Sequence, residues 1–322
     1  MEKIKQFENS EYEELIGALV GDIFYEGAIS NTTKIAIIRR YSEIILRKIF
    51  NIPETERMTI GGSRIKEAVK EKNNSFLSNA IDVLHTYGDE NTHTEKTTLP
   101  TDDELSSVIN ALYDLLAYLF IDYFEKYRFG TDSNVMAVFS ILPPDLRLKI
   151  LSHLYENDKN NISIIDKYVL AILKSNSEEA ALKWIDERKE SLETLSVATK
   201  ENDERTILQY GEELAELFFS KRPKNMYELC YNKVINVAEQ IKKNGPLYKT
   251  FEEAKQLYVT KGILPEIKNE YIEFNSIMNF CYLGRIASRI VRNFFEKSHA
   301  NQAAFCSLSH SIFCSRRVSA LM

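Results

Sequence analysis

The sequence is poor in the residues that interrupt helices. Of its 322 residues only 11 are glycine and 7 are proline. Because these two residues punctuate turns and loops, their scarcity disfavours a fold of many short strands. Hydrophobic residues make up 44 % of the chain, an ordinary supply of core side chains that excludes disorder as the main state. We therefore predict an all-α protein, long enough for two domains.

Cysteines, a basic surplus and long apolar runs are also scarce. The four cysteines, at positions 230, 281, 306 and 314, show no CxxC spacing, so neither a zinc knuckle nor a disulfide framework is expected. The formal net charge is −6, whereas proteins that coat nucleic acid carry extra Lys and Arg. No apolar run approaches the roughly 20 residues that span a bilayer. The N-terminal sequence is too charged for a signal peptide. We predict a cytoplasmic protein with no membrane segment, no metal and no cofactor.

Apolar periodicity and capping signals predict the helices. Apolar residues recur at steps of three and four across Asn31–Phe50, with Asn31 or Thr32 as the cap and Pro53 beyond the end. A capping box, Thr101 to Glu104, opens a helix that runs from Asp102 to Lys126. We expect these two helices to pack antiparallel in one bundle. Other predicted helices are Ser63–Lys72, Ser75–Tyr87, Asp145–Tyr155, Ile162–Lys174, Glu178–Thr194, Glu204–Phe219, Met226–Lys243, Phe251–Val259 and Lys268–Lys297.

The composition also predicts where the chain divides. Gly130–Ser133 is the best candidate boundary, which gives an N-terminal bundle over residues 1–130 and a C-terminal helical domain over residues 131–297. Residues 298–322 differ in kind, with six serines, two of the four cysteines and no acidic residue. We interpret them as a flexible, non-native tail and leave them out of the functional interpretation.

Two short segments in the first domain carry most of the charged and titratable candidates. In Ile38–Glu43, Arg40 and Glu43 lie one helical turn apart and can form an ordinary solvated ion pair. In Leu84–His93, two histidines and a carboxylate surround Gly88. Histidine is the natural acid or base near neutral pH, although a helix that ends at a glycine and leads into a polar loop (Gly88–Pro100) explains the same pattern without any chemistry.

Taken in order, these segments and the long apolar helix that follows resemble the HEPN superfamily, over about Ser30–Tyr127. The resemblance is to the branch fused to type I restriction subunits and other prokaryotic defence proteins. In that branch one helix reads approximately A-x-x-x-L-R-x-x-x-E, to which Thr33–Glu43 is similar, and a later segment reads approximately L-R-x-x-G-N-x-A-A-H, to which Leu84–His93 is similar. The resemblance implies a homodimer and places the catalytic histidine at His93 and the motif glycine at Gly88.

The departures from the family pattern concern charge. His85 stands at the position of the branch arginine, Asp89 replaces the asparagine, and the arginine that active members carry shortly before the histidine is missing. In the family the histidine activates the ribose 2′-hydroxyl and the arginine stabilises charge on the phosphate, which is usually the largest catalytic effect. The site therefore looks degenerate, or takes its positive charge from Arg39, Arg40 or a partner subunit.

Other candidate residues have structural explanations. Gly61–Arg64, before a predicted helix, could bind an anion, but it lacks Walker spacing and is typical of a plain turn. We expect His153 to lie on a helix surface or in the core, Trp184 to belong to the core, and Cys230 and Cys281 to be buried thiols.

Three hypotheses of function follow. The leading one is an accessory or assembly protein of a prokaryotic anti-phage defence or toxin system, which binds a protein partner, RNA or DNA through the degenerate module. The second is a metal-independent endoribonuclease centred on His93, with His85 and Asp89 beside it. A nucleic-acid-binding or structural motif is predicted at Arg39, Arg40, Glu43 and Arg64. The third is a purely structural helical adaptor.

Overall fold

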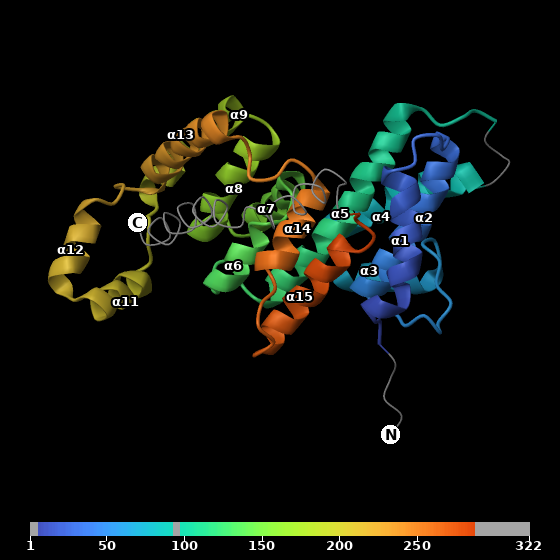
Figure 1. Cartoon of the computed structure of the whole chain (residues 1–322), viewed down its shortest axis with the longest axis horizontal. Coiled ribbons are helices and arrows are strands. Elements are labelled where there is room, and N and C mark those ends of the chain that lie inside the picture. Colours follow the sequence, from blue (N-terminus) through green and yellow to red (C-terminus); the bar gives the residue numbers. More distant parts are fainter. Residues whose placement is uncertain (1–5, 93–96, 287–322) are drawn as a thin grey trace, which may run out of the picture. The chain divides into compact units, whose positions relative to one another are not determined.

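The structure is a computed structural model that describes residues 6–92 and 97–286 (Figure 1). Within these residues all regular structure is helical, as the sequence predicts, and no strand occurs. A short 3-10 helix, Asn9–Tyr12, precedes fifteen α-helices. They are α1 Glu13–Phe24, α2 Asn31–Ile49, α3 Ser63–Lys72, α4 Ser75–Thr92, α5 Asp102–Lys126, α6 Ser133–Phe139, α7 Pro144–Asn157, α8 Ile162–Ser175, α9 Glu178–Asp186, α10 Lys189–Thr194, α11 Lys200–Tyr210, α12 Glu212–Ser220, α13 Met226–Asn244, α14 Phe251–Lys261 and α15 Asn269–Tyr282.

The chain forms two compact units. Unit 1 contains the residues up to Leu154 together with Ala254–Ile286, and unit 2 contains Tyr155–Glu253. The boundary predicted at Gly130–Ser133 therefore falls inside unit 1. The boundary falls there because helices after it pack on α5. Phe139 of α6 lies against the Phe124 ring, and Phe274 of α15 packs against the rings of Phe120, Tyr123 and Phe124. Aromatic burial thus ties a late helix to the N-terminal bundle.

The core of unit 1 is built around α5. The predicted capping box is present, because the Thr101 hydroxyl accepts from the Glu104 amide and the Glu104 carboxylate accepts from the Thr101 amide. Both α2 and α4 pack on α5. α5 is the one helix in the described part of the chain that is long and apolar enough to cross a membrane, but more than half of its most apolar stretch is buried in the unit. That burial is the pattern of a core helix.

The prediction that α2 and α5 pack antiparallel is wrong. At their first turns, the Asn31 side-chain amide donates to Asp102 Oδ1 at 2.9 Å, and at their last turns Lys48 and Lys126 line one groove. The two helices therefore run in the same direction. α4 lies between them in sequence and runs back along α5, because it starts just after Lys72, whose ammonium pairs with Asp122 near the end of α5.

Two helix ends in unit 1 differ from the prediction. Ser30, rather than Asn31 or Thr32, caps α2, and its hydroxyl accepts from the Thr33 amide. α4 does not stop at Tyr87 but continues through Gly88 to Thr92. A glycine ends a helix when the backbone there turns left-handed, and Gly88 instead stays helical.

Unit 2 is a helical layer in which α8, α9 and α13 pack on one another. The predicted helix Glu178–Thr194 is divided into α9 and α10 at Glu187–Arg188, which lets both Ile185 and Leu192 reach the core. Trp184 is half-buried rather than fully buried, with its ring 5.1 Å from the Tyr155 ring and 5.2 Å from that of Tyr168.

A helical hairpin, α11 and α12, interrupts this layer. Gly211, with a φ of 81°, divides the predicted helix Glu204–Phe219 into these two helices, because that backbone conformation is outside an α-helix. The base of the hairpin is closed by the Met226 amide, which donates to the Leu195 carbonyl at 3.0 Å. Likewise Gly284, with a φ of 71°, follows the end of α15, and the rest of the predicted helix to Lys297 lies largely outside the described residues, as does the predicted tail 298–322.

Candidate functional site

The two motif segments of the sequence meet in unit 1 through Arg39. This residue projects from the middle of α2 onto the last turns of α4, where its guanidinium Nη1 pairs with Asp89 Oδ1. The Arg39 side chain is only 18 % exposed. A guanidinium held in this way keeps its charge but has a carboxylate as its partner.

Asp89 bridges Arg39 to a histidine. Its second oxygen, Oδ2, lies 3.1 Å from Nε2 of His85, one turn earlier on α4. His85 and Asp89 are each about a third exposed, at 36 % and 37 %. A carboxylate beside an imidazole fixes the orientation of the ring and favours a proton on the facing nitrogen. We name Arg39, His85 and Asp89 the arginine–histidine–aspartate cluster.

Two glycines make room for this cluster. Gly88 is buried, and a Cβ there would lie 2.8 Å from Arg39 Cδ and 3.1 Å from Nη1. In the loop before α3, a Cβ on Gly61 would lie 2.1 Å from His85 Nε2. A Cβ at either position would therefore have to displace the side chain of Arg39 or His85, so glycine at both positions permits the observed packing. The predicted turn at Gly61 and Gly62 is present, and it also forms a wall for His85, which no local sequence signal indicates.

The ion pair predicted between Arg40 and Glu43 is not formed. Glu43 accepts a hydrogen bond from the Ile60 amide at 3.1 Å, and so holds the loop that presents Gly61 to His85. Arg40 is exposed, and within the described part of the chain no ion pair involves it. The neighbouring Arg39, one step around the helix, is the arginine that faces α4. Glu43 is therefore a positioning residue of this site rather than a partner of Arg40.

Two other predicted site residues lie elsewhere. Arg64, on the first turn of α3, pairs with Glu56 and is half exposed, and so it is not part of the cluster. His93 lies outside the described residues, directly after the end of α4 at Thr92. The site that can be described therefore consists of the arginine–histidine–aspartate cluster with its two glycines and Glu43.

The cluster has a specific charge balance. One cation, Arg39, faces one carboxylate, Asp89, whose other oxygen is occupied by His85. A compensated guanidinium attracts phosphate far less than a free one, since the carboxylate repels the same anion. With a neutral imidazole the cluster carries no net charge, so it offers little electrostatic stabilisation to an extra negative charge.

The remaining candidates have structural roles. Cys230 and Cys281 are buried as predicted, and burial raises the pKa of each thiol to about 12. His153 packs 5.3 Å from the ring of Phe76, and burial lowers its pKa. Across the residues that the structure describes, no three His, Cys, Asp or Glu side chains gather as metal ligands.

Sequence reasoning missed a second site, which contains Lys48. This lysine follows Tyr41 and Ile45 at helical spacing and so falls on the apolar side of α2. A lysine on an apolar helical face is the signal that could have found it. Comparison with known protein families, with curated proteins and with solved structures finds no match for this chain, so the resemblance to HEPN domains rests on the motif residues alone.

Proposed function

We propose that this chain is an accessory or assembly protein of a prokaryotic anti-phage defence or toxin system, acting in the cytoplasm through a degenerate HEPN-like module. In this proposal the module binds a protein partner or nucleic acid and does not cleave RNA by itself. The observation that carries it is the pairing of Arg39 with Asp89, at the position where the similar family segment has asparagine.

The argument is one of charge. Attack of a ribose 2′-hydroxyl adds negative charge to a phosphate that is already anionic, and a well-placed cationic donor is worth a few kcal/mol in such a step. Arg39 is the cation that packs against the motif, and Asp89 already occupies it. The second acid of the segment, Glu90, is exposed on the same helix. An anionic substrate would therefore meet compensated charge rather than a free arginine.

A partner-binding surface in unit 2 supports the assembly part of the proposal. The α11–α12 hairpin exposes Leu208, Leu214 and Leu217 at 86 %, 51 % and 49 %, although leucine is usually buried. Helix α12 carries three glutamates and no basic residue. Leucines beside one-sided acidic charge fit a basic amphipathic helix of a protein partner, whose apolar face would cover them.

A homodimer is part of the proposal, because the resemblance implies pairing through the motif helices and two-fold dimers are the commonest closed oligomers. Sedimentation at tens of micromolar tests it. A species of 37.2 kDa alone would count against the dimer.

The decisive experiment is an RNA digest in EDTA with the wild-type protein beside His93→Ala. We expect little or no cleavage by either protein, because the cluster supplies no uncompensated positive charge. Robust wild-type cleavage that disappears in His93→Ala would overturn the proposal in favour of a metal-independent endoribonuclease.

The position of Arg39 favours the enzymatic alternative, and the variant Asp89→Asn tests it. Arg39 contacts α4, the helix that leads to His93, and its charge is neutralised there by Asp89. Asp89→Asn restores the residue of the family pattern and removes the carboxylate from Arg39. We expect salt-sensitive RNA binding to increase in this variant, since a released guanidinium can contact phosphate. Asp82→Asn, at an exposed position of the same helix, is the matched control for the charge change.

The outcomes of these variants separate the three hypotheses. Increased RNA binding by Asp89→Asn without cleavage supports a degenerate nucleic-acid module, and increased cleavage supports an enzyme held inactive by Asp89. Equal RNA binding by Asp89→Asn and Asp82→Asn would favour the hypothesis that the chain binds a protein partner through the hairpin. If co-expression with the proteins encoded beside this gene also yields no complex that depends on Leu214 and Leu217, the structural adaptor is the remaining hypothesis.

A further inference from the structure

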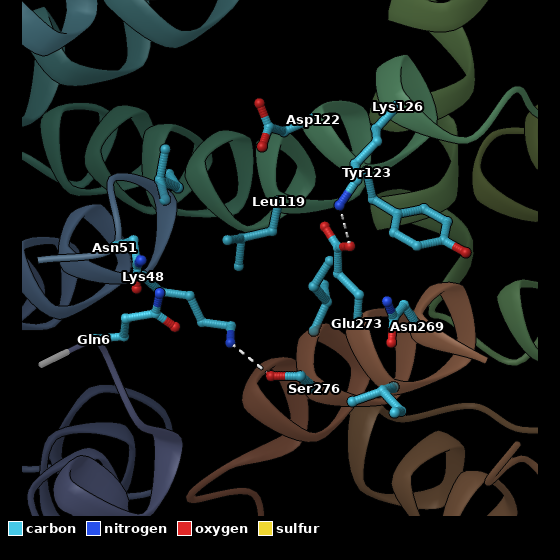
Figure 2. A pocket seen from close by; sticks show the side chains of 13 residues that line it. Gln6, Lys48, Asn51, Leu119, Asp122, Tyr123, Lys126, Asn269, Glu273 and Ser276 are labelled. Atoms are coloured by element: carbon cyan, nitrogen blue, oxygen red, sulfur yellow. Dashed lines mark hydrogen bonds and ion pairs between the residues drawn. The ribbon is translucent and has the colours of Figure 1, made fainter. Parts of the chain in front are cut away.

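A groove of about 610 Å³ opens in unit 1, away from the arginine–histidine–aspartate cluster (Figure 2). It lies where the last turns of α2 and α5 meet α15, and its lining includes Lys48, Lys126 and Glu273. Apolar side chains, Leu119 and Ile272 among them, form part of its wall. Most of the lining residues are polar, and polar groups that converge on a concave surface can fix a small ligand.

Lys48 is the unusual group of this groove. Its ammonium donates to the Asn9 side-chain oxygen and to Ser276 Oγ, both at 2.9 Å, and the second of these bonds is drawn in Figure 2. It also lies over two aromatic rings, 5.5 Å from the centre of Phe7 and 5.3 Å from that of Phe280. All of these partners are neutral. No carboxylate pairs with Lys48 among the residues that the structure describes.

The acids of the groove are already paired with other lysines. Glu273 accepts from Lys126 at 2.6 Å and from the Tyr127 hydroxyl at 3.1 Å. Asp122 pairs with Lys72. Each carboxylate that lines the groove therefore already has a lysine partner other than Lys48, and the Lys48 ammonium is left with neutral partners. Burial lowers the pKa of Lys48 to about 8, against the opposing effect of Glu273.

A half-buried ammonium without an anion is costly, because its charge has lost part of its hydration and gained only neutral dipoles and ring faces in return. A buried cation with a perturbed pKa that lies in a cleft is a candidate for a functional site. Two of the three ammonium hydrogens are used by Asn9 and Ser276, which leaves one for a ligand.

We propose that this groove binds a small organic anion, a carboxylate or a phosphate ester, whose charged group pairs with Lys48 and whose apolar part lies along Leu119 and Ile272. The inference does not depend on the proposed function, since the groove and the cluster share no residue.

The first test is calorimetric titration of the whole chain with hexanoate and with phenyl phosphate. Hexanol and hexylammonium are the neutral and cationic controls. We expect an anion to bind and both controls to fail. Lys48→Met, which keeps the length of the side chain, should weaken anion binding by roughly tenfold to a hundredfold, the usual worth of a charge-assisted hydrogen bond. Lys66→Met, at an exposed position of α3, removes the same charge elsewhere and should bind like the wild type.

The two anions separate the sources of the ligand charge. Tighter binding of hexanoate assigns the groove to carboxylates, and tighter binding of phenyl phosphate assigns it to phosphate esters. Binding of neither anion overturns the proposal, as does equal binding by the wild type and Lys48→Met, or equal binding of hexanol.

A second measurement uses only the wild-type protein, so it holds even if Lys48→Met fails to fold. An anion beside Lys48 stabilises its charged form and raises its pKa, so binding at pH 9 should take up protons from the buffer. Burial raises the pKa of Tyr123, and the hydrogen bond to Glu273 raises that of Lys126, so both keep their protons at pH 9. Binding heats that do not vary among buffers of different ionisation enthalpy would contradict a role for Lys48.

Discussion

At the scale of single residues, two glycines decide whether the motif segments can meet. The absence of a Cβ at Gly88 leaves room for the side chain of Arg39, and its absence at Gly61 leaves room for that of His85. The sequence alone indicates a glycine at a helix end for the first and a turn for the second. Their actual roles depend on partners 49 and 24 residues away in the chain, which no local pattern reveals.

Gly88→Ala tests this explanation. In an open helix interior the change from glycine to alanine stabilises by up to about 1 kcal/mol. At Gly88 the added methyl meets Arg39 at 2.8 Å, so we expect destabilisation instead, by about 1–3 kcal/mol in urea unfolding.

Gly17→Ala is the control for that substitution, because Gly17 lies inside α1 with nothing within 4 Å of a new Cβ. It should be neutral or stabilising. The cost at Gly88 should fall when Arg39 is shortened to alanine in the same chain. Two glycine variants with the same effect would show that the contact with Arg39 is unimportant.

Lys48 gives a prediction about pH. Its pKa is lowered to about 8 in the folded protein from 10.5, so between these values the unfolded chain binds more protons than the folded one. The contribution of Lys48 to the free energy of unfolding therefore rises as the pH increases from 8 to 10.5. Lys48→Met should remove that rise and stabilise the protein at pH 7 by roughly 1–2 kcal/mol, because a poorly solvated charge is gone.

Urea unfolding of wild type and variant at pH 7, 8, 9 and 10 measures both effects. Lys66→Met, at an exposed site, should keep the pH dependence of the wild type. Parallel curves for wild type and Lys48→Met would mean that Lys48 is hydrated like an ordinary surface lysine.

At the scale of elements, sequence patterns predict helices well where the signal is local. The helix from Ser63 to Lys72 and the capped helix from Asp102 to Lys126 occur with the predicted bounds. Three of the errors occur where a glycine was interpreted without its backbone angle, whereas the break at Glu187–Arg188 involves no glycine. Gly211 and Gly284 adopt positive φ and interrupt predicted helices, whereas Gly88 stays helical. The direction of α2 relative to α5 was also beyond the sequence, since matched apolar faces suit either direction.

The candidate site was also predictable only as far as local sequence signals reach. The segments that carry Arg39, Glu43, His85 and Asp89 were identified, because charged residues and histidines stand out against apolar periodicity. Which arginine turns inward depends on the rotation of α2 in the bundle, and here Arg39 faces α4 whereas Arg40 faces solvent. That choice is set by tertiary packing.

The α11–α12 hairpin is an element that unit 2 should be able to lose. Leu195 and Met226 are joined by a hydrogen bond at its base, so residues 197–224 can be replaced by a short Gly-Ser linker without moving the ends of the chain apart. Of the hairpin helices, α11 contributes no buried residue and α12 contributes only Ala215. We expect the shortened chain to remain folded.

Trp184, the single tryptophan, lies in unit 2 and reports on that loss by fluorescence excited at the red edge of its absorption. The thermal transition of the shortened chain should match that of the full chain within a few degrees. A large loss of stability would show that the hairpin is part of the core, and would also remove the basis for treating its leucines as a partner surface.

At the scale of the whole molecule, the division into two units predicts independent folding of one of them. Within the described residues, unit 2 is the continuous segment Tyr155–Glu253, whereas unit 1 consists of two separate segments of the chain. The buried residues of unit 2 come from helices of that same segment, among them Ile165, Ile185 and Val234. A continuous segment of about 100 residues with its own core is of the size that folds alone.

We therefore expect residues 155–253, expressed alone, to unfold cooperatively, with circular dichroism and Trp184 fluorescence following one transition. The aromatic packing of Trp184 on Tyr155 and Tyr168 lies wholly within the segment, so the fluorescence of the isolated unit should match that of the full chain.

Residues 6–154 alone are the informative counterpart. They lack α15, which packs on α5 through Phe274 and supplies Ser276 to Lys48, so this fragment should be less stable than unit 2 and should lose the anion-binding groove. A non-cooperative unit 2, or a fragment 6–154 that is as stable as the full chain, would mean that the energetic units of this protein differ from its compact ones.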